Sequence, residues 1–413
     1  MIKKIGAGIV LAWLLGGCSG GIPGIKDANG WSKGDRDAFL KIYQKDPYLS
    51  ACGLDGLYQQ YRVNKDSAIL TQMLTGYARN LANSCIDLKA FRAAQAARRA
   101  RGIKTYYATS LQQVDTATIM AKLKKGATID EILAPYVPAA PQYKKLKAAY
   151  KPRSKDPAQA KIRLNIERTK LLPQSNWDTY IEINVPEYML RFYEGGHVTM
   201  QFPIIVGKPA WQTPIFSSTM KYIVLNPTWT MTENIIRETI DKHLLKDPGY
   251  LKRHNMKVYE GYKEDAPEIN PRTINWKKYA GKDNKTPIPY RIVQGSSKKN
   301  ALGTVKFMFP NRFSVYMHDT QAKSLFKREK RAFSHGCMRL SQPQKLLEKV
   351  ATGYAGTSMA LIEKHKKNRK ISYVNLKRTI PVHIVYQTAY VDGGKVKFFD
   401  DVYGFDAIQK VRP

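Results

Sequence analysis

The spacing of apolar residues changes once along the chain, and this change limits the possible folds more than any other feature. Between residues 35 and 150 apolar side chains recur every three or four positions, the period of amphipathic helices. From Trp177 onward they alternate with polar side chains, as Ile181 and Ile183 do around Glu182, which indicates half-buried strands. Further strands are expected at 198–204, 222–225, 305–309, 313–318 and 359–362. The chain is therefore predicted to be an α+β protein in which a helical domain precedes a mostly β domain.

Changes in composition mark the expected boundaries. Residues 18–34 are Gly-rich and polar, as in a flexible tether, and residues 151–161 form a basic stretch with two prolines that is typical of a linker. An insertion at 226–303, with helical character at its start, interrupts the β pattern and is expected to form a lid or binding loop. The predicted parts are a helical scaffold domain at 35–160 that ends in the linker, a β domain at 162–370 and a C-terminal β segment at 371–413.

Local signals add detail to the C-terminal third. Ser341 and Gln344 fit a capping box at the start of a helix. The basic run at 364–370 is expected to be a solvated connector, and Asp392-Gly393-Gly394 predicts a hairpin turn.

The first eighteen residues have the pattern of an export signal. Two lysines precede a short apolar stretch that ends at Leu15, too short to span a membrane as a helix. Leu15-Gly16-Gly17-Cys18 resembles the lipobox of bacterial lipoproteins, so residues 1–17 are expected to be a signal peptide and Cys18 to be lipidated. An ordinary cleaved signal with an incidental cysteine is the alternative. Ser19 favours the outer membrane of a Gram-negative bacterium, which places the protein in the periplasm.

The net charge limits the classes of molecule that the protein is expected to bind. With 68 Lys and Arg against 33 Asp and Glu, the chain carries a formal charge of +35 and should bind anionic polymers or lipids. Export to the periplasm removes nucleic acid as a normal partner and leaves the cell wall and lipid head groups.

The four cysteines divide by expected role. Cys18 is the lipidation candidate, and Cys337 lies in a chemically distinctive sequence. Cys52 and Cys85 then remain as a candidate disulfide in an oxidising compartment. Two separate buried thiols are the alternative, and the sequence does not choose between them.

The segment from Ser334 to Arg339 holds the strongest candidate for a reactive group. The Cys337 thiol is a strong nucleophile only as a thiolate, so it needs a base or a positive environment. His318, at the end of the strand expected at 313–318, is the candidate base, and Tyr316 would lie on the same strand face. Arg339 would favour the thiolate. Gly336 would let a backbone N–H approach a developing oxyanion.

Other interpretations of these residues exist. A cysteine near a histidine is often a small buried hydrophobe, and His318 and His335 can be core histidines. A zinc site formed by both histidines and Cys337 is conceivable, but the chain has neither a C-x-x-C nor an H-E-x-x-H motif to support it.

The spacing of these residues resembles the active-site signature of the L,D-transpeptidases, which have a YkuD-type catalytic domain. His318 is followed by fifteen residues and then by Ser334-His335-Gly336-Cys337 and Arg339. Segments elsewhere are similar to the larger, YcbB-like branch of the family in order and spacing: 205–209, 212–218, 247–250, 300–311, 315–320, 381–386 and 400–404. The resemblance implies a mostly β sandwich or barrel with a helical capping subdomain at about 226–303.

The resemblance also implies roles for the site residues. Cys337 would be the nucleophile and His318 the general base, oriented by the backbone carbonyl of Ser334 or Gly336. Arg339, Tyr316, His335 and Trp229 would contact the substrate. That substrate would be the stem tetrapeptide of peptidoglycan, which loses its terminal D-Ala and is joined to a second stem, without a cofactor or metal.

One departure from the family pattern concerns wall binding. YcbB-like relatives commonly carry a peptidoglycan-binding domain where this chain has only residues 151–161, so the basic surface and the Cys18 lipid are expected to hold the protein near the wall. Alternatives within the same chemistry are an L,D-carboxypeptidase and an enzyme that attaches proteins to the wall. A non-catalytic wall-binding lipoprotein is the more distant alternative.

Overall fold

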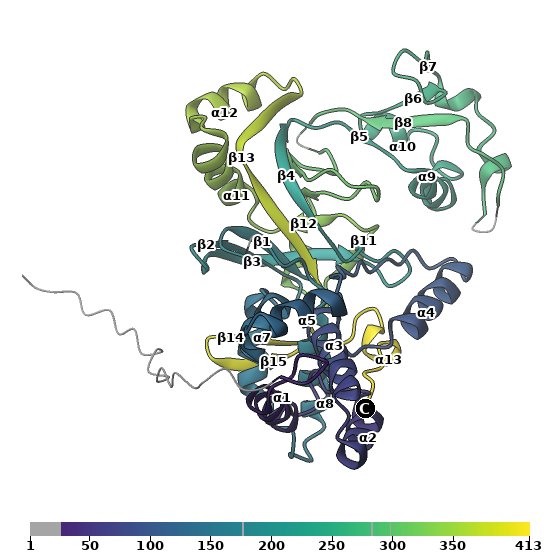
Figure 1. Ribbon diagram of the computed structural model, residues 1–413. Coiled ribbons are helices and arrows are strands. Elements are labelled where there is room, and N and C mark those ends of the chain that lie inside the picture. The colour runs from purple at the N-terminus through teal and green to yellow at the C-terminus, as the bar shows by residue number, and fades with distance from the viewer. Residues whose placement is uncertain (1–25, 176, 282–283, 298) are drawn as a thin grey trace, which may run out of the picture. The chain divides into compact units, whose positions relative to one another are not determined.

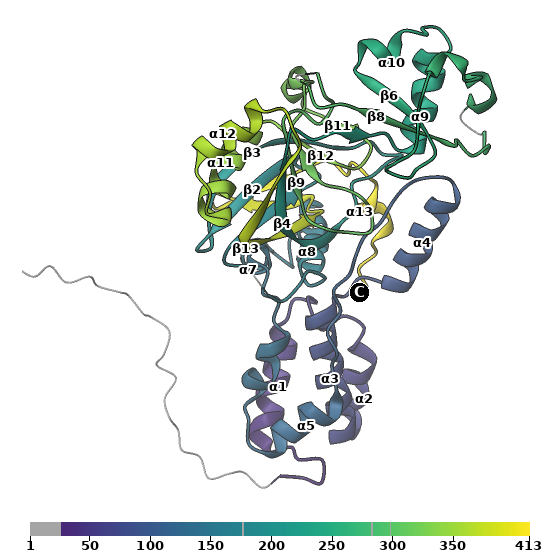
Figure 2. The ribbon, with the colours of Figure 1, turned by 90° about the horizontal axis from the view of Figure 1, so that it is seen from above.

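The structure is a computed structural model that describes residues 26–175, 177–281, 284–297 and 299–413 (Figures 1 and 2). It divides into two units, one with residues 26–79 and 113–137 and the other with residues 80–112 and 138–413. The boundary expected at residue 160 does not coincide with this division, because residues 80–112 and 138–160 group with the β-rich unit. The predicted signal peptide, Cys18 and residues 19–25 of the predicted tether lie outside the described residues.

The first unit is helical, as the three-to-four spacing predicts. The helix α1 begins in a capping box in which Ser32 accepts from the Asp35 amide, and Thr128 and Glu131 form a second capping box at α6. Trp31, Phe39 and Tyr77 pack as aromatic neighbours in its core. Its helices are α1 (Lys33–Lys45), α2 (Asp55–Asn64), most of α3 (Ser67–Asn83), α5 (Thr116–Lys124), α6 (Ile129–Leu133) and the 3₁₀ helix η1 (Ala134–Tyr136).

The second unit is built on a nine-stranded sheet in the described part of the chain. The strand order is β11-β3-β12-β10-β9-β4-β13-β1-β2, and β2 also pairs with β3, so the sheet closes into a barrel. Strand β13, predicted to belong to a separate C-terminal segment, lies between β1 and β4. The strands are β1 (Tyr180–Asn184), β2 (Met189–Glu194), β3 (His197–Gly207), β4 (Phe216–Leu225), β9 (Val305–Met308), β10 (Met317–His318), β11 (Ala332–Ser334), β12 (Met338–Leu340) and β13 (Ser372–Val385).

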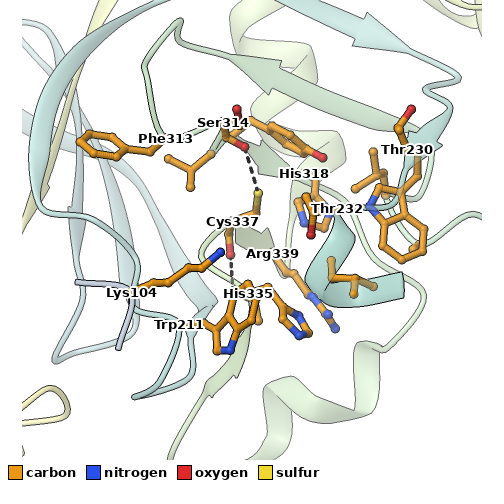
Figure 3. A pocket seen from close by; sticks show the side chains of 17 residues that line it. Lys104, Trp211, Thr230, Thr232, Phe313, Ser314, His318, His335, Cys337 and Arg339 are labelled. Atoms are coloured by element: carbon orange, nitrogen blue, oxygen red, sulfur yellow. Dashed lines mark hydrogen bonds between the residues drawn. The ribbon is translucent and has the colours of Figure 1, made fainter. Parts of the chain in front are cut away.

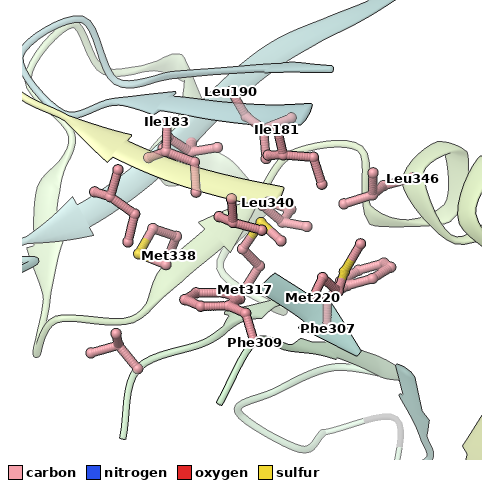
Figure 4. Close-up of a cluster of buried hydrophobic side chains, with 14 of the residues drawn as sticks. Ile181, Ile183, Leu190, Met220, Phe307, Phe309, Met317, Met338, Leu340 and Leu346 are labelled. Atoms are coloured by element: carbon pink, nitrogen blue, oxygen red, sulfur yellow. The ribbon is translucent and has the colours of Figure 1, made fainter. Parts of the chain in front are cut away.

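The barrel core follows the alternation of the strands. Ile181 and Ile183 of β1 are fully buried, as are Met317 and Met338 of the parallel strands β10 and β12 (Figure 4). Leu346 closes the core from the helix α11 (Pro343–Val350), which continues into the π-helix η6 (Ala351–Ala355). Each fully buried aliphatic side chain of this kind contributes about 1.5–3 kcal/mol relative to exposure.

Helices and a hairpin cover part of the barrel's outer surface. Glu182 of β1, expected to face solvent, is buried and accepts a 2.6 Å hydrogen bond from the Tyr390 hydroxyl. The hairpin predicted at Asp392-Gly393-Gly394 is confirmed by the pairing of β14 with β15. These outer elements are α4 (Leu88–Ala100), α7 (Pro141–Ala149), α8 (Ala158–Thr169), β14 (Ala389–Asp392), β15 (Lys395–Phe398) and α13 (Phe405–Ile408).

The insertion at 226–303 has a core of its own, which includes Ile236, Val258 and Ile292. It was expected to be helical, but it also contains a four-stranded sheet in the order β5-β8-β6-β7. Its elements are β5 (Trp229–Thr230), α9 (Glu233–Thr239), the π-helix η2 (Ile240–Leu244), α10 (Tyr250–Arg253), β6 (Met256–Glu260), β7 (Glu268–Ile269), η3 (Pro271–Thr273), η4 (Trp276–Tyr279) and β8 (Tyr290–Gln294).

Three local predictions are wrong. The strand expected at 359–362 is the start of α12 (Met359–Lys367), and this helix also takes up most of the expected basic connector. The capping box of Ser341 does not form, because α11 starts at Pro343 after Gln342 and has no side-chain cap. Of the strand expected at 313–318 only Met317 and His318 are extended, since Ser314 turns the chain with a φ of +54°.

The linker expected at 151–161 is shorter than predicted, because α8 begins at Ala158. Within the described residues no helix is both long and apolar enough to cross a bilayer.

Candidate active site

A cavity of about 300 Å³ lies where β10 and β12 end beneath the insertion. Its lining includes seven residues that the sequence singled out: Cys337, His318, Tyr316, Arg339, His335, Trp229 and Ser334. Figure 3 shows Cys337, His318 and Arg339 around this cavity. Gly336 lines a neighbouring cavity.

The pairing of two short strands brings the reactive side chains together. Strands β10 and β12 are parallel, with Met317 opposite Met338 and His318 opposite Arg339. Residues paired in this way share a face, so the methionines enter the core while His318 and Arg339 face the cavity. Tyr316 and Cys337, two positions before His318 and Arg339, also line the cavity. The shared face predicted for Tyr316 and His318 is therefore present, although the strand is shorter than expected.

The imidazole of His318 is fixed by a backbone carbonyl. Its Nδ1 lies 2.5 Å from the carbonyl oxygen of Asp319. Because a carbonyl only accepts, Nδ1 carries the proton, and Nε2 of the neutral ring keeps the lone pair that a general base needs. Burial lowers the pKa of His318 to about 3, and the positive charge of Arg339 adds to this effect. His318 is thus neutral at physiological pH.

The orienting carbonyl is not one of the two that were predicted. The Ser334 carbonyl accepts from the Lys208 amide at 2.9 Å, and the Gly336 carbonyl accepts from the Thr213 hydroxyl at 2.8 Å. Both carbonyls therefore accept from other donors. The carbonyl of Asp319, the residue after His318, orients the imidazole instead.

The Cys337 thiol is partly exposed in the cavity, with its sulfur 3.9 Å from the Ser314 carbonyl oxygen. Burial raises the pKa of Cys337 to about 11, although hydrogen bonding to Tyr316 and the charges of Lys306 and Arg339 oppose this rise. Arg339 therefore favours the thiolate, as expected, but desolvation of the sulfur outweighs its effect.

Arg339 brings an unpaired positive charge to the cavity. Burial lowers the pKa of its guanidinium, and its Nε is buried without a hydrogen-bond partner. No carboxylate within the described ranges forms an ion pair with it. A buried cation without a partner favours an anionic ligand, and a guanidinium matches the geometry of a carboxylate.

Ser334 and Gly336 shape the turn that carries Cys337, the predicted nucleophile, and we call this segment the nucleophile turn. The Ser334 hydroxyl donates to the Cys337 carbonyl at 2.6 Å and accepts from the Gly336 amide at 3.1 Å. The Gly336 amide is therefore already engaged within the turn. Glycine is needed here because its φ is +120°, a conformation that other residues rarely adopt.

His335 connects the nucleophile turn to the insertion. Its Nε2 lies 3.1 Å from Glu238 of α9 and 3.3 Å from the Lys208 ammonium, which itself donates to Glu238 at 2.7 Å. We call Lys208, Glu238 and His335 the latch. His335 lines the cavity as predicted, but its Nε2 already contacts protein groups. The described chain contains no group of three or more His, Cys, Asp or Glu that could hold a metal ion.

Several residues of the site were not predicted. Thr213 links the Gly207 amide to the Gly336 carbonyl, and the Tyr403 hydroxyl binds the Gly207 carbonyl at 2.8 Å. Lys306 lies 5.0 Å from the centre of the Tyr316 ring, and Lys104 lines the cavity from outside the barrel. Thr213 and Tyr403 fall in segments that support the family resemblance, whereas nothing in the sequence marked Lys104 or Lys306.

The remaining predicted cysteines are buried. Cys52 and Cys85 are both disulfide-bonded, which removes the alternative of two separate thiols. Their pairing with each other stays a prediction.

Comparison with known proteins supports the family assignment. The family profile named YkuD, which describes the L,D-transpeptidase catalytic domain, matches residues 178–367. A curated Haemophilus influenzae protein, named provisionally as an L,D-transpeptidase, is 29% identical over 246 residues, or 60% of this chain and 48% of that protein. The chain thus spans about half the length of this relative.

Solved structures with similarity to the chain are also L,D-transpeptidases. The enzyme from Mycobacterium smegmatis is 12% identical over 50% of this chain and 58% of its own, with a TM-score of 0.23. The catalytic domain of the Enterococcus faecium enzyme is 15% identical over 51% of this chain and 98% of its own, with a TM-score of 0.20. These TM-scores are low, so the profile and the curated relative carry the comparison. Residues 178–367 of this chain match the family model of the YkuD-type L,D-transpeptidase catalytic domain.

Proposed function

We propose that the protein is a periplasmic L,D-transpeptidase that forms a cysteine acyl-enzyme with the stem tetrapeptides of peptidoglycan. The observation that carries this proposal is the convergence of three groups on one cavity: the Cys337 thiol, the His318 imidazole with its proton on Nδ1, and the unpaired Arg339 guanidinium. A nucleophile, a base and a carboxylate-binding cation are the groups that removal of a terminal amino acid from a peptide requires.

The first half of the proposed reaction acylates the enzyme. The Cys337 sulfur attacks the carbonyl carbon that joins diaminopimelate to the terminal D-Ala, and the thiol proton passes to Nε2 of His318. The tetrahedral intermediate collapses, the C–N bond breaks, and His318 gives the proton to the departing D-Ala amine. A thioester on Cys337 and free D-Ala result.

The second half transfers the acyl group. The side-chain amine of diaminopimelate on another stem attacks the thioester carbonyl, the C–S bond breaks, and a proton returns to the sulfur through His318. The product is a 3→3 cross-link. Arg339 would hold a carboxylate of the donor, and Tyr316 and Trp229 would contact its chain. The insertion above the cavity would limit access of water, which competes for the thioester.

The decisive experiment incubates the purified protein with a disaccharide-tetrapeptide and identifies the products by mass spectrometry. Dimers that lack one D-Ala support transpeptidation. Tripeptide monomers alone indicate a carboxypeptidase, and no product at all would refute both. Acyl mass on Cys337, also after treatment with a carbapenem, and its loss in Cys337→Ala would identify the nucleophile. Activity that survives in Cys337→Ala would refute the proposed chemistry.

We also propose that a lipid on Cys18 anchors the protein in the outer membrane. The lipobox-like sequence that ends at Cys18 supports this location. Metabolic labelling with a fatty acid and fractionation of membranes would test it. A Cys18→Ala variant should lose both the label and the membrane association, whereas an unlabelled wild-type protein would refute the anchor.

A further inference from the structure

The active-site cavity continues into two further cavities along the outside of the barrel. The second cavity, of about 490 Å³, shares Lys104 and Phe313 with the first. The third, of about 510 Å³, shares Arg99 and Tyr106 with the second. Four cations line this path, and we call them the basic groove: Arg92, Arg99, Lys104 and Arg312. Three of them come from residues that precede the family domain.

The segment that builds the groove is fixed to the nucleophile turn. The Lys104 amide donates to the Ala210 carbonyl at 3.0 Å, and the Lys104 carbonyl accepts from the Gln212 amide at 2.9 Å. Thr213, next in sequence to Gln212, holds the Gly336 carbonyl at 2.8 Å. A continuous set of hydrogen bonds therefore connects the groove to the turn that carries Cys337.

The helix α4 is held on the same side of the barrel. The Arg98 guanidinium donates to the carbonyls of Tyr403 and Gly404 at 2.7 and 2.8 Å. With Arg98 anchored in this way, Arg92 and Arg99 of the same helix line the groove.

Two of the four cations of the groove lie over aromatic rings rather than beside acids. The Arg312 guanidinium lies 4.6 Å from the centre of the Tyr106 ring, and the Lys104 ammonium lies 4.3 Å from that of Trp211. Across the described ranges, Arg99, Lys104 and Arg312 form no ion pair, and no Asp or Glu lines the second or third cavity. Burial lowers the pKa of Lys104, and the charge of Glu233 partly offsets this. Such a surface favours a ligand with several separated carboxylates.

We propose that the basic groove binds the acceptor stem peptide through its free carboxylates, an inference that rests on the proposed transpeptidase function. His318, Tyr316 and Arg339 all lie on the side of the first cavity, which leaves that cavity to the donor. The acceptor then approaches along the groove and reaches the thioester where the cavities meet, near Lys104 and Phe313. Its amine nitrogen bonds to the thioester carbon as the C–S bond breaks, and the proton passes through His318 to the sulfur.

The experiment separates the two half-reactions in a variant with Arg99→Glu and Arg312→Glu. Release of D-Ala in a single turnover, with the tetrapeptide as donor, measures acylation. Formation of cross-linked product against the concentration of a tripeptide acceptor measures the acceptor KM. Because charged hydrogen-bonded contacts are each worth more than a neutral one, the acceptor KM should rise about tenfold or more while acylation stays unchanged. Arg153→Glu, an exposed charge reversal outside the cavities, is the matched control and should change neither.

The outcomes distinguish this inference from the proposed function. An unchanged acceptor KM in the double variant, or an equal loss of acylation, would overturn the groove as the acceptor site. Failure of the wild-type protein to release D-Ala would instead overturn the proposed function. Arg99→Lys with Arg312→Lys should retain most of the acceptor binding, and a loss as large as that of the glutamate variant would point to damaged folding, which circular dichroism would detect.

Discussion

At the scale of single residues, burial sets the protonation of the reacting pair before substrate arrives. Because burial lowers the pKa of His318 to about 3 and raises that of Cys337 to about 11, both groups are neutral over the range between these values. The resting site is then a thiol beside an imidazole rather than an ion pair. In the mechanism proposed above, the proton would therefore move during the attack, and His318 would act as a general base rather than as a permanent counter-ion.

This protonation state predicts the pH dependence of thiol reactivity. A thiol is mostly protonated below its pKa, so a pKa of about 11 means that the small thiolate fraction rises about tenfold per pH unit through neutral and mildly alkaline pH. Alkylation of Cys337 by iodoacetamide should increase accordingly between pH 7 and about 9. His318→Ala should leave this profile nearly unchanged while it abolishes acylation by substrate. A rate that is constant across this range and falls in His318→Ala would indicate a preformed thiolate–imidazolium pair.

The sequence identified the chemical residues but not their surroundings. Cys337, His318 and Arg339 stand in one recognisable spacing, and they do converge on one cavity. Their protonation could not be derived, because desolvation depends on what covers a group and not on the charges near it in sequence. The carbonyl that orients His318 was missed for a similar reason, since the residue types around Asp319 do not determine the direction of its backbone carbonyl.

At the scale of elements, the nucleophile turn depends on a hydroxyl from another segment. Thr213 is fully buried, and its side chain accepts from the Gly207 amide and donates to the Gly336 carbonyl. Thr213→Val would leave both groups unpaired, at a cost of about 1–3 kcal/mol for each. We expect a lower melting temperature and a clear loss of acylation rate. Thr213→Ser keeps the hydroxyl and should restore most of both, and a Val variant that behaves like the wild type would contradict this role.

The latch predicts how firmly the insertion covers the cavity. Burial opposes ionisation of Glu238, but hydrogen bonds from Lys208 and His335 lower its pKa to about 2. A lowered carboxyl pKa stabilises the ionised contact above the ordinary value near 4.5, and this stabilisation is lost only as the pH falls toward about 2. The latch should therefore persist at pH 5.

Substitution of Glu238 by Ala tests the latch directly. Hydrogen exchange of the amides in α9 and η2 should become faster in this variant, because the contact to the barrel is lost. Lys242→Ala removes only a largely exposed partner of Glu238, at 3.3 Å, and serves as the control. Equal exchange in the Glu238→Ala variant and the wild type would show that apolar packing alone holds the insertion.

Helices and strands could be predicted where the apolar pattern extends over many residues, but not where it covers only a few. The four residues at 359–362 read equally well as a buried strand or a helix, and Ser358 decides for the helix by capping the Leu361 amide. The alternation of β1 was detected, but its outer face is covered, so Glu182 is buried against Tyr390. The sheet of the insertion was missed because β5 and β7 have two residues each.

At the scale of the whole molecule, the charge of +35 predicts how the protein associates with the wall. Salt screens charges, and the Debye length falls from about 10 Å at 0.1 M salt to about 3 Å at 1 M. Protein that lacks Cys18 should therefore pellet with purified peptidoglycan at low salt and be released at high salt. Pelleting that is insensitive to salt would show that specific contacts, rather than charge, hold the protein on the wall.

The position of β13 has a consequence for how the chain reaches its native state. This strand lies beyond residue 367, where the family match ends, yet it sits between β1 and β4 and pairs with both. About two hundred residues separate β1 from β13, so the ring of strands stays open until the chain has been synthesised through β13, and its closure is a long-range event. A fragment that stops at residue 367 should therefore fail to give dispersed NMR signals, even though it contains both Cys337 and His318. The cavity around these two side chains would then take shape only after residues 372–385 have left the ribosome.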